Sequence, residues 1–153
     1  MSFDRQTLPH EVVIPSDLHV ARRVEEDILR AVASVGYSRE DRFAIRLALE
    51  EAIVNAHKHG NRSDPTRTIT ISYAIDAHRV IVRVRDEGGG FAFRTVPDPT
   101  SPDRLSVPSG RGIMLMRAYV DGIEYNERGN EVQLVKKNTR VSGLRTEKPE
   151  VHP

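Results

Sequence analysis

Residues 51–61 read EAIVNAHKHGN and end a segment whose apolar residues recur at helical spacing. Ser38 is typical of a helix N-cap, with Asp41 three residues on in a capping-box-like arrangement, and Gly60 is typical of a helix end. We therefore expect a helix from Ser38 to about His59. Within it, Glu51 and Asn55 lie one turn apart on an otherwise apolar stripe. The stripe is formed by Ala44, Leu47, Ala48 and Val54.

A carboxylate on such a stripe is costly to bury unless a partner or a metal compensates its charge. Glu51 and Asn55 are therefore either a functional pair or a polar pair satisfied by neighbouring backbone or by an arginine. The opposite side of the helix carries polar residues, which we expect to face solvent, with Glu50 paired to Arg46. These residues are Arg42, Arg46, Glu50 and His57.

Residues 86–91, DEGGGF, follow a predicted strand. Glycines there allow a sharp turn and close approach of a ligand, and Asp86 can accept a hydrogen bond from an amino group. The alternative is a plain glycine turn. The segment is neither a P-loop nor a dinucleotide fingerprint, because the lysine or the helix-opening glycine that those motifs need is missing.

Residues 109–112, SGRG, open a further predicted helix, where free N–H groups and Arg111 could hold an anion. The proline-rich stretch 91–109 before it has the length of an active-site lid. His57 and His59 are two apart on a helix and diverge by about 200°, so they cannot chelate one ion together.

The remaining pattern predicts the order β-α-α-β-β-loop-α-β-β. Strands are expected at 11–15 (an edge strand), 68–75, 80–85, 122–125 and 131–137, and helices from Ser16 or Asp17 to Gly36, over 38–59 and over 111–120. This order favours an α+β fold, a two-layer sandwich with helices on one face of a mixed sheet. We expect one domain over 1–137 and a polar, disordered tail over 138–153.

Composition narrows the class of protein. The 153 residues carry 23 Lys and Arg against 22 Asp and Glu, a net charge of +1, which gives no field suited to nucleic acid. The absence of cysteine excludes disulfides and thiol chemistry. No apolar run approaches the roughly 18 residues of a membrane span, and the N-terminus does not resemble a secretory signal. We therefore expect a soluble cytoplasmic protein without a nucleic-acid or membrane partner.

Together, residues 51–61, Asp86-x-Gly88-x-Gly90 and Gly110-x-Gly112 resemble the N, G1 and G2 boxes of the GHKL (Bergerat-fold) ATPases. The resemblance covers about 12–137 and implies helices on one face of a mixed, mostly antiparallel sheet. Within the superfamily the chain is most similar to the anti-sigma-factor serine kinases. That implies ATP and Mg²⁺ as cofactors.

The resemblance also implies roles for individual residues. Asn55 would ligate Mg²⁺, Glu51 would be the general base toward a substrate serine, and Asp86 would accept from the adenine amino group. The other implied nucleotide contacts are Lys58, His59, Gly60, Gly88, Gly90, Gly110, Arg111 and Gly112.

Two positions depart from the family pattern. Gly129-Asn130 replaces the usual Gly-Thr, and we expect a substitute contact from Asn130. Pro108 stands where some members have an arginine, so Arg111 or Arg104 would take over that arginine's role.

The implied function is an ATP-dependent serine kinase and anti-sigma factor that acts by partner switching. It would phosphorylate a STAS-domain anti-anti-sigma protein and bind a sigma factor, or another output regulator, as a homodimer. Two alternatives remain at this point. One is a nucleotide-dependent binding module with little kinase activity, and the other is a detached histidine-kinase catalytic domain.

Overall fold

The computed structural model describes residues 6–88 and 117–141. Its elements are β1 (His10–Pro15), α1 (Leu18–Ser34), α2 (Arg39–Val54), η1 (Asn55–Gly60), β2 (Thr68–Ile75), β3 (Arg79–Asp86), β4 (Gly122–Tyr125) and β5 (Glu131–Lys137). The five predicted strands are confirmed, β1 beginning one residue earlier and β3 extending one residue further at each end. Of the predicted helix over 111–120, residues 117–119 are helical and 111–116 lie outside the described residues. The predicted lid, 91–109, also lies outside them.

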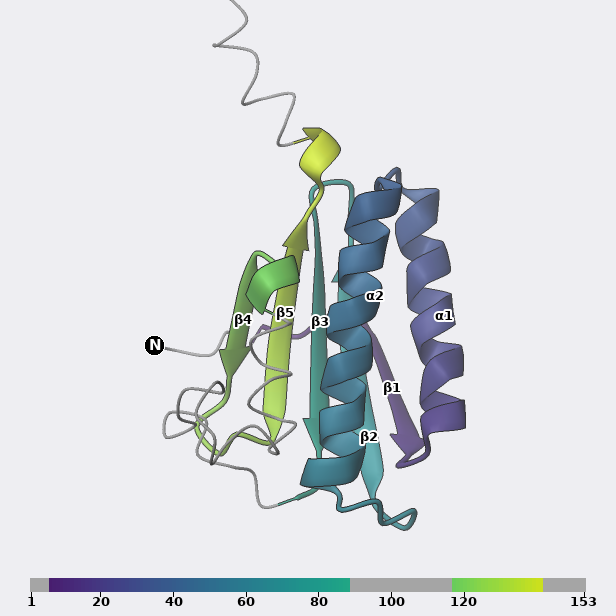
Figure 1. Cartoon of the computed structure of the whole chain (residues 1–153), viewed down its shortest axis with the longest axis vertical. Helices are drawn as coiled ribbons and strands as arrows, with labels where there is room; N and C mark the ends of the chain where they lie inside the picture. Colours follow the sequence, from purple (N-terminus) through teal and green to yellow (C-terminus); the bar gives the residue numbers. More distant parts are fainter. Residues whose placement is uncertain (1–5, 89–116, 142–153) are drawn as a thin grey trace, which may run out of the picture.

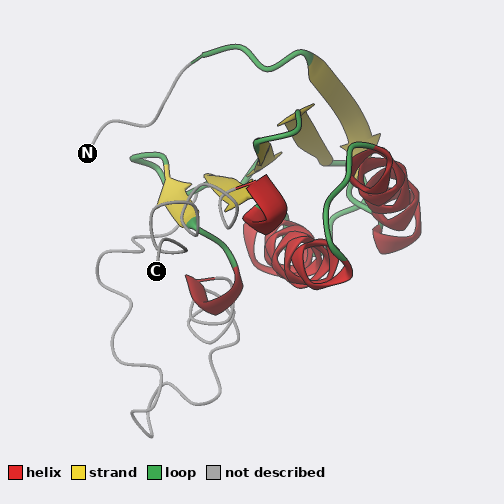
Figure 2. Ribbon diagram, turned by 90° about the horizontal axis from the view of Figure 1, so that it is seen from above, coloured by secondary structure: helices red, strands yellow, loops and turns green. Residues whose placement is uncertain are grey.

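The strands form one sheet in the order β1-β2-β3-β5-β4, so β1 is an edge strand as predicted. Helices α1 and α2 lie side by side on one face of this sheet (Figures 1 and 2). The predicted α+β sandwich is thereby confirmed. All four strand pairings are antiparallel, so in the described part of the chain the sheet is not mixed.

The start of α1 is set by Asp17, whose carboxylate accepts hydrogen bonds from the N–H groups of His19 (2.8 Å) and Val20 (3.3 Å). Side-chain acceptors at this position satisfy amide groups that the helix itself leaves free. After Ser34 the chain turns at Gly36, whose φ of +93° favours glycine. This confirms the predicted helix boundaries.

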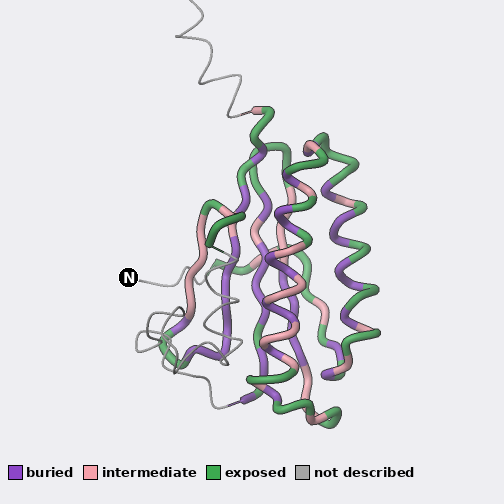
Figure 3. Tube along the Cα trace, in the orientation of Figure 1, coloured by how far each residue is buried: buried purple, intermediate pink, exposed green. Residues whose placement is uncertain are grey.

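Helix α2 begins as predicted, since the Ser38 hydroxyl accepts the Asp41 N–H at 3.0 Å. Asp41 does not complete a capping box, because its carboxylate faces Lys136 (3.3 Å) and accepts from Thr139. The core between helices and sheet is a single cluster, and Figure 3 shows it as buried stretches along both layers. Its fully buried members include Ile28, Val32, Leu49, Ile69 and Ile71.

The solvent-facing side predicted for α2 is only partly correct. Glu50 is half-buried and shares a hydrogen bond with the Glu25 carboxyl group of α1, instead of forming the predicted pair with Arg46. His57 is also half-buried, and its Nδ1 lies 2.8 Å from the Ser16 hydroxyl. Glu50 therefore connects α2 to α1, and His57 connects η1 to the turn before α1.

The predicted tail begins too early. Asn138 is buried, its side chain donates to the Ala77 carbonyl at 2.9 Å, and Arg140 donates to the Gly36 carbonyl at 3.0 Å. Thr139 donates to Asp41 through both its N–H and its hydroxyl. The folded unit thus continues to at least residue 140, whereas 142–153 lie outside the described residues.

Candidate functional site

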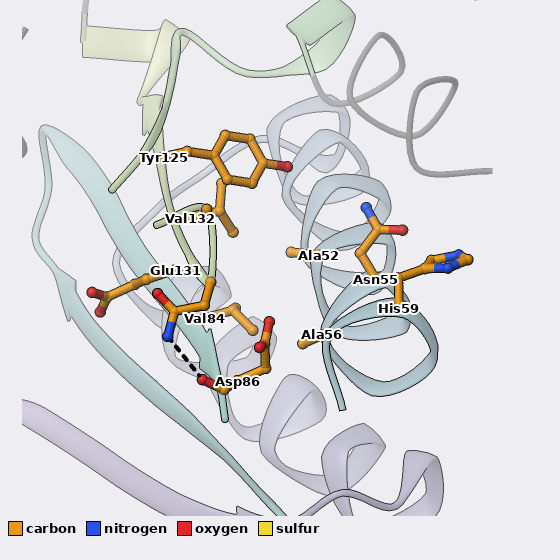
Figure 4. A pocket seen from close by; sticks show the side chains of 12 residues that line it. Ala52, Asn55, Ala56, His59, Val84, Asp86, Tyr125, Glu131 and Val132 are labelled. Atoms are coloured by element: carbon orange, nitrogen blue, oxygen red, sulfur yellow. Dashed lines mark hydrogen bonds between the residues drawn. The ribbon is translucent and has the colours of Figure 1, made fainter. Parts of the chain in front are cut away.

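A pocket of about 80 Å³ lies between the end of the α2–η1 segment and strands β3, β4 and β5. Figure 4 shows Ala52, Ala56 and Asn55 on the helical side and Asp86, Val132 and Tyr125 on the sheet side. The pocket is lined by Ala52, Asn55, Ala56, His59, Gly60, Val84, Asp86, Tyr125, Gly129, Asn130, Glu131 and Val132. Helical and strand segments that are far apart in the sequence thus meet around a mostly apolar cavity.

The helical wall of the pocket ends in a π-helical turn, not in the continuous α-helix predicted to His59. The α-helix stops at Val54, and η1 closes with a hydrogen bond from the Asn61 N–H to the Ala56 carbonyl at 2.8 Å. A π turn contains one residue more than an α turn, so the residues after it face other directions than an α-helix would give. Such turns are frequent at functional sites.

Asn55 is the first residue of η1, and its side-chain oxygen Oδ1 is buried without a hydrogen-bond partner in the described part of the chain. A buried polar oxygen without a partner is unfavourable, because desolvation is not compensated. Carbonyl oxygens are ligands that Mg²⁺ accepts. The free oxygen on the pocket wall therefore fits the metal-ligand role implied for Asn55.

Glu51, one turn before Asn55, is half-buried, and this burial raises the pKa of its carboxyl group above the ordinary value. The positive charge of Lys58 partly counteracts the shift. Burial also raises the pKa of the Tyr125 phenol; the Arg117 charge lowers it, and the negative charge of Glu51 raises it further. Glu51 thus lies within electrostatic reach of a pocket residue, although it does not line the pocket itself.

Asp86 ends β3 at the floor of the pocket and is 9% exposed. Burial raises the pKa of its carboxyl group, while the hydrogen bond from the Gly88 N–H (2.8 Å) opposes the shift. A Cβ atom added to Gly60 would lie 2.6 Å from the Asp86 Oδ1 and closer still to the rest of the carboxylate. A Cβ on Gly88 would collide with the Gly60 carbonyl. Both glycines are therefore needed for η1 to approach Asp86.

Asn130 makes the predicted substitute contact, but with the backbone of Asp86 and not with its carboxylate. Its Nδ2 donates to the Asp86 carbonyl (3.3 Å, dashed in Figure 4), and its own carbonyl accepts the Asp86 N–H at 2.9 Å. The turn is held by Asn126, whose Oδ1 accepts N–H groups from Gly129 (2.8 Å), Asn130 (3.1 Å) and Glu131 (3.3 Å). We assigned no role to Asn126 from the sequence, although an Asn before a Gly-containing turn was a usable signal.

Asn61 is a second residue to which sequence reasoning gave no separate role. It is fully buried, donates from Nδ2 to the Thr68 carbonyl at 2.9 Å and accepts the Glu87 N–H at 2.8 Å. The Glu87 carboxylate in turn accepts the Thr68 N–H at 2.8 Å. These bonds tie the end of η1 to the start of β2 and the end of β3.

The other predicted site residues divide into two groups. His59 lines the pocket rim with its ring directed away from Asp86 (Figure 4), and Lys58 is exposed and does not line the pocket. Gly90, Gly110, Arg111 and Gly112 lie outside the described residues, as do Arg104 and Pro108. The structure thus brings together Asn55, His59, Gly60, Asp86 and Gly88, with Glu51 close by.

Comparison with known proteins gives consistent matches. The histidine kinase-like ATPase domain family matches residues 14–136. The chain is 29% identical over 120 residues to the anti-sigma F factor of Anoxybacillus flavithermus, covering 74% of this chain and 81% of that protein. It is 30% identical over 117 residues to the serine-protein kinase RsbW of Bacillus subtilis, covering 71% and 72%.

A solved structure shows the same fold. The crystal structure of the RsbU and RsbW domains of Rv1364c from Mycobacterium tuberculosis superposes with a TM-score of 0.57 at 19% identity, covering 86% of this chain and 32% of that one. In the described residues of the present chain, no helix is both long and apolar enough to cross a membrane.

Proposed function

Since the chain belongs to the histidine kinase-like ATPase domain family, we propose that it binds ATP in the pocket beside η1 and phosphorylates a serine of a partner protein. The partner would be a STAS-domain anti-anti-sigma protein, and the chain would act as an anti-sigma factor by partner switching. The relatives named anti-sigma F factor and serine-protein kinase RsbW support this reading. The observation that carries it is the buried, unpartnered Oδ1 of Asn55 on the wall of a pocket whose floor is Asp86.

The lining of the pocket suits a purine base. Ala52, Ala56, Val84 and Val132 give apolar surface for a flat ring. Asp86 gives one buried acceptor on the floor, where a purine amino group could donate. Because a buried acceptor left unpaired is costly, an analogue without that amino group should bind more weakly.

Asn55 would hold the metal ion through Oδ1. Mg²⁺, when bound, would neutralise charge on the phosphates, which is the main requirement of phosphoryl transfer. We further propose that Gly90, Gly110, Arg111 and Gly112 contact the phosphates and that 91–109 forms a lid.

Glu51 would take the proton of the substrate serine. Its raised pKa moves the carboxyl group closer to working pH, which makes it a better general base. The serine oxygen forms a bond to the γ-phosphorus as the bond from that phosphorus to the β,γ-bridging oxygen breaks. The serine proton passes to Glu51 and ADP leaves.

The assembly also belongs to the proposal. We expect the chain to bind a sigma factor, or another output regulator, as a homodimer and to release it when the unphosphorylated antagonist competes. We expect this to take place in the cytoplasm.

The test is transfer of γ-labelled phosphate from Mg-ATP to the STAS-domain protein encoded beside this chain. We expect acid-stable label on serine with the wild-type chain and with Glu50→Gln, and none with Glu51→Gln. Glu50→Gln is the matched control, because the neighbouring carboxyl group contacts α1 and does not line the pocket. Unchanged transfer with Glu51→Gln would disprove the assigned base, and acid-labile label would indicate phosphohistidine instead.

Asn55→Ala tests the nucleotide site separately. We expect the Mg-dependent part of ATP affinity to be lost, as measured by titration calorimetry with and without the metal. Equal Mg²⁺ dependence in wild type and variant would mean that Asn55 does not hold the metal.

A further inference from the structure

A groove of about 460 Å³ runs along the outer side of the two helices, away from the nucleotide pocket. Its lining comes from the second half of α1 and the first half of α2, namely Glu26, Leu29, Arg30 and Ala33, and Arg39, Arg42, Phe43 and Arg46. None of these residues lines the pocket beside η1. In Figures 1 and 2 no described element covers this side of the helix layer, so the groove is open to a partner.

The groove carries four arginines and a single glutamate. Two of the arginines have partners within the chain, since Arg30 pairs with Asp27 and Arg42 donates to the Tyr37 carbonyl at 2.7 Å. No hydrogen bond or ion pair holds Arg39 or Arg46 to another described residue. Both residues are exposed. The Arg46 charge acts on the nearby Glu25 carboxyl group and partly opposes the rise of its pKa. Both guanidinium groups nevertheless keep N–H donors available for carboxylates of a ligand.

Apolar side chains line the same groove. Phe43 is 54% exposed and meets the Tyr119 ring edge-on, with ring centroids 6.3 Å apart. Ala33 adds exposed apolar surface from α1, whereas Leu29 lines the base of the groove and is 7% exposed. Large exposed aromatic side chains beside arginines are typical of interface centres, where a partner removes the ring from water.

The spacing of the arginines distinguishes between ligands. Arg39, Arg42 and Arg46 follow one another at i, i+3 and i+7, so they lie on one face of α2 over about 10 Å. A single phosphate could reach one or two of them and would leave the apolar surface uncovered. A segment with carboxylates at helical spacing and an apolar side could engage Arg39 and Arg46, together with the N–H groups of Arg42 that do not bond Tyr37, and cover Phe43 as well.

We propose that this groove is a docking site for an acidic amphipathic segment of a partner protein. Carboxylates of the segment face the arginines of α2, and its apolar side chains pack on Phe43 and Ala33. The site is separate from the nucleotide pocket, so its test does not depend on the proposed kinase activity.

The probe is a fluorescein-labelled, helix-forming peptide of about 15 residues, with Glu at i, i+3 and i+7 and Leu on the adjoining stripe. Its dissociation constant is measured by fluorescence anisotropy for the full chain, for the double variant Arg39→Glu/Arg46→Glu and for Arg79→Glu. The last variant makes the same charge change at an exposed residue at the start of β3, outside the groove. Circular dichroism and nucleotide binding establish that each variant is folded.

We expect the double variant to weaken peptide binding at least about tenfold, because attraction is replaced by repulsion at two sites. Arg79→Glu should stay within about twofold, and Phe43→Ser should weaken binding without changing any charge. The proposal is overturned if the wild type does not bind the peptide, or if Arg79→Glu weakens binding as much as the double variant. It is also overturned if a DNA oligonucleotide of equal charge binds as tightly and with the same sensitivity to the variants, since the groove would then attract any polyanion.

Discussion

Replacement of Asn61 by alanine should destabilise the fold and weaken nucleotide binding together. The Asn61 side chain is fully buried, and it accepts the Glu87 N–H and donates to the Thr68 carbonyl. Alanine leaves both backbone groups without this partner in a site closed to water, and each costs about 1–3 kcal/mol. We therefore expect the free energy of unfolding to fall by about 2–6 kcal/mol, a large part of the roughly 5–15 kcal/mol that a domain has.

Urea unfolding at neutral pH measures the loss, and the chain offers a matched control in Asn138→Ala. Asn138 is also buried, donates to the Ala77 carbonyl and accepts the Arg140 N–H at 3.1 Å. It follows the last residue of β5, whereas the pocket is lined by the first two residues of that strand. Both variants should lose stability, whereas only Asn61→Ala should lose ATP affinity, since Asn61 holds Glu87, the residue directly after Asp86. A loss below about 1 kcal/mol for Asn61→Ala, or equal loss of ATP affinity in both variants, would refute this reasoning.

Three further predictions concern buried groups. Burial and the neighbouring Glu50 carboxyl group raise the pKa of Glu25 from 4.5 to about 8. The protonated Glu25 side chain therefore stabilises the fold at acidic pH, and this contribution is lost as the pH rises from about 4.5 toward about 8. Glu25→Gln should flatten the resulting decline of the unfolding free energy, measured by urea titration over that pH range. Gly60→Ala should displace the Asp86 carboxylate and weaken ADP binding, measured by calorimetry, at least about tenfold. An affinity equal to that of the wild type would contradict this and would show that η1 moves aside. Asn126→Ala removes one acceptor that three N–H groups share, so the unfolding free energy measured in thermal melts should fall by about 1–3 kcal/mol. The control Glu127→Ala, in the same turn, should not reproduce this loss.

Much of the fold could be predicted because its signals are local. Alternating β-branched residues and turn residues define the strands within one residue, and the Asp17 and Ser38 caps define the helix starts. The resemblance of three short motifs then indicated how these elements assemble. It also selected Asn55 and Asp86, which the structure brings to one pocket.

The missed features depend on contacts between distant segments. A π turn at Asn55 gives no local signal, because the same residues also fit an α-helix. Asp41 was expected to close a local capping box, yet its partners are 95 and 98 residues further along the chain. Helical spacing predicts a pair of Glu50 with Arg46, whereas the partner of Glu50 is the Glu25 carboxyl group of the other helix. Spacing within a helix identifies candidate neighbours, but tertiary packing decides between them.

The contact between Asp41 and the residues after β5 has a consequence for shortening the chain. Burial alone would raise the pKa of this carboxyl group, but the Thr139 N–H and hydroxyl and the Lys136 ammonium group outweigh it and lower the pKa. A truncation at residue 137, where the last strand ends, would remove the Thr139 donors and leave a carboxylate that is 2% exposed beside Lys136 alone. An expression boundary chosen from secondary structure would thus cut into the folded unit, and the shortest stable fragment should retain residue 140.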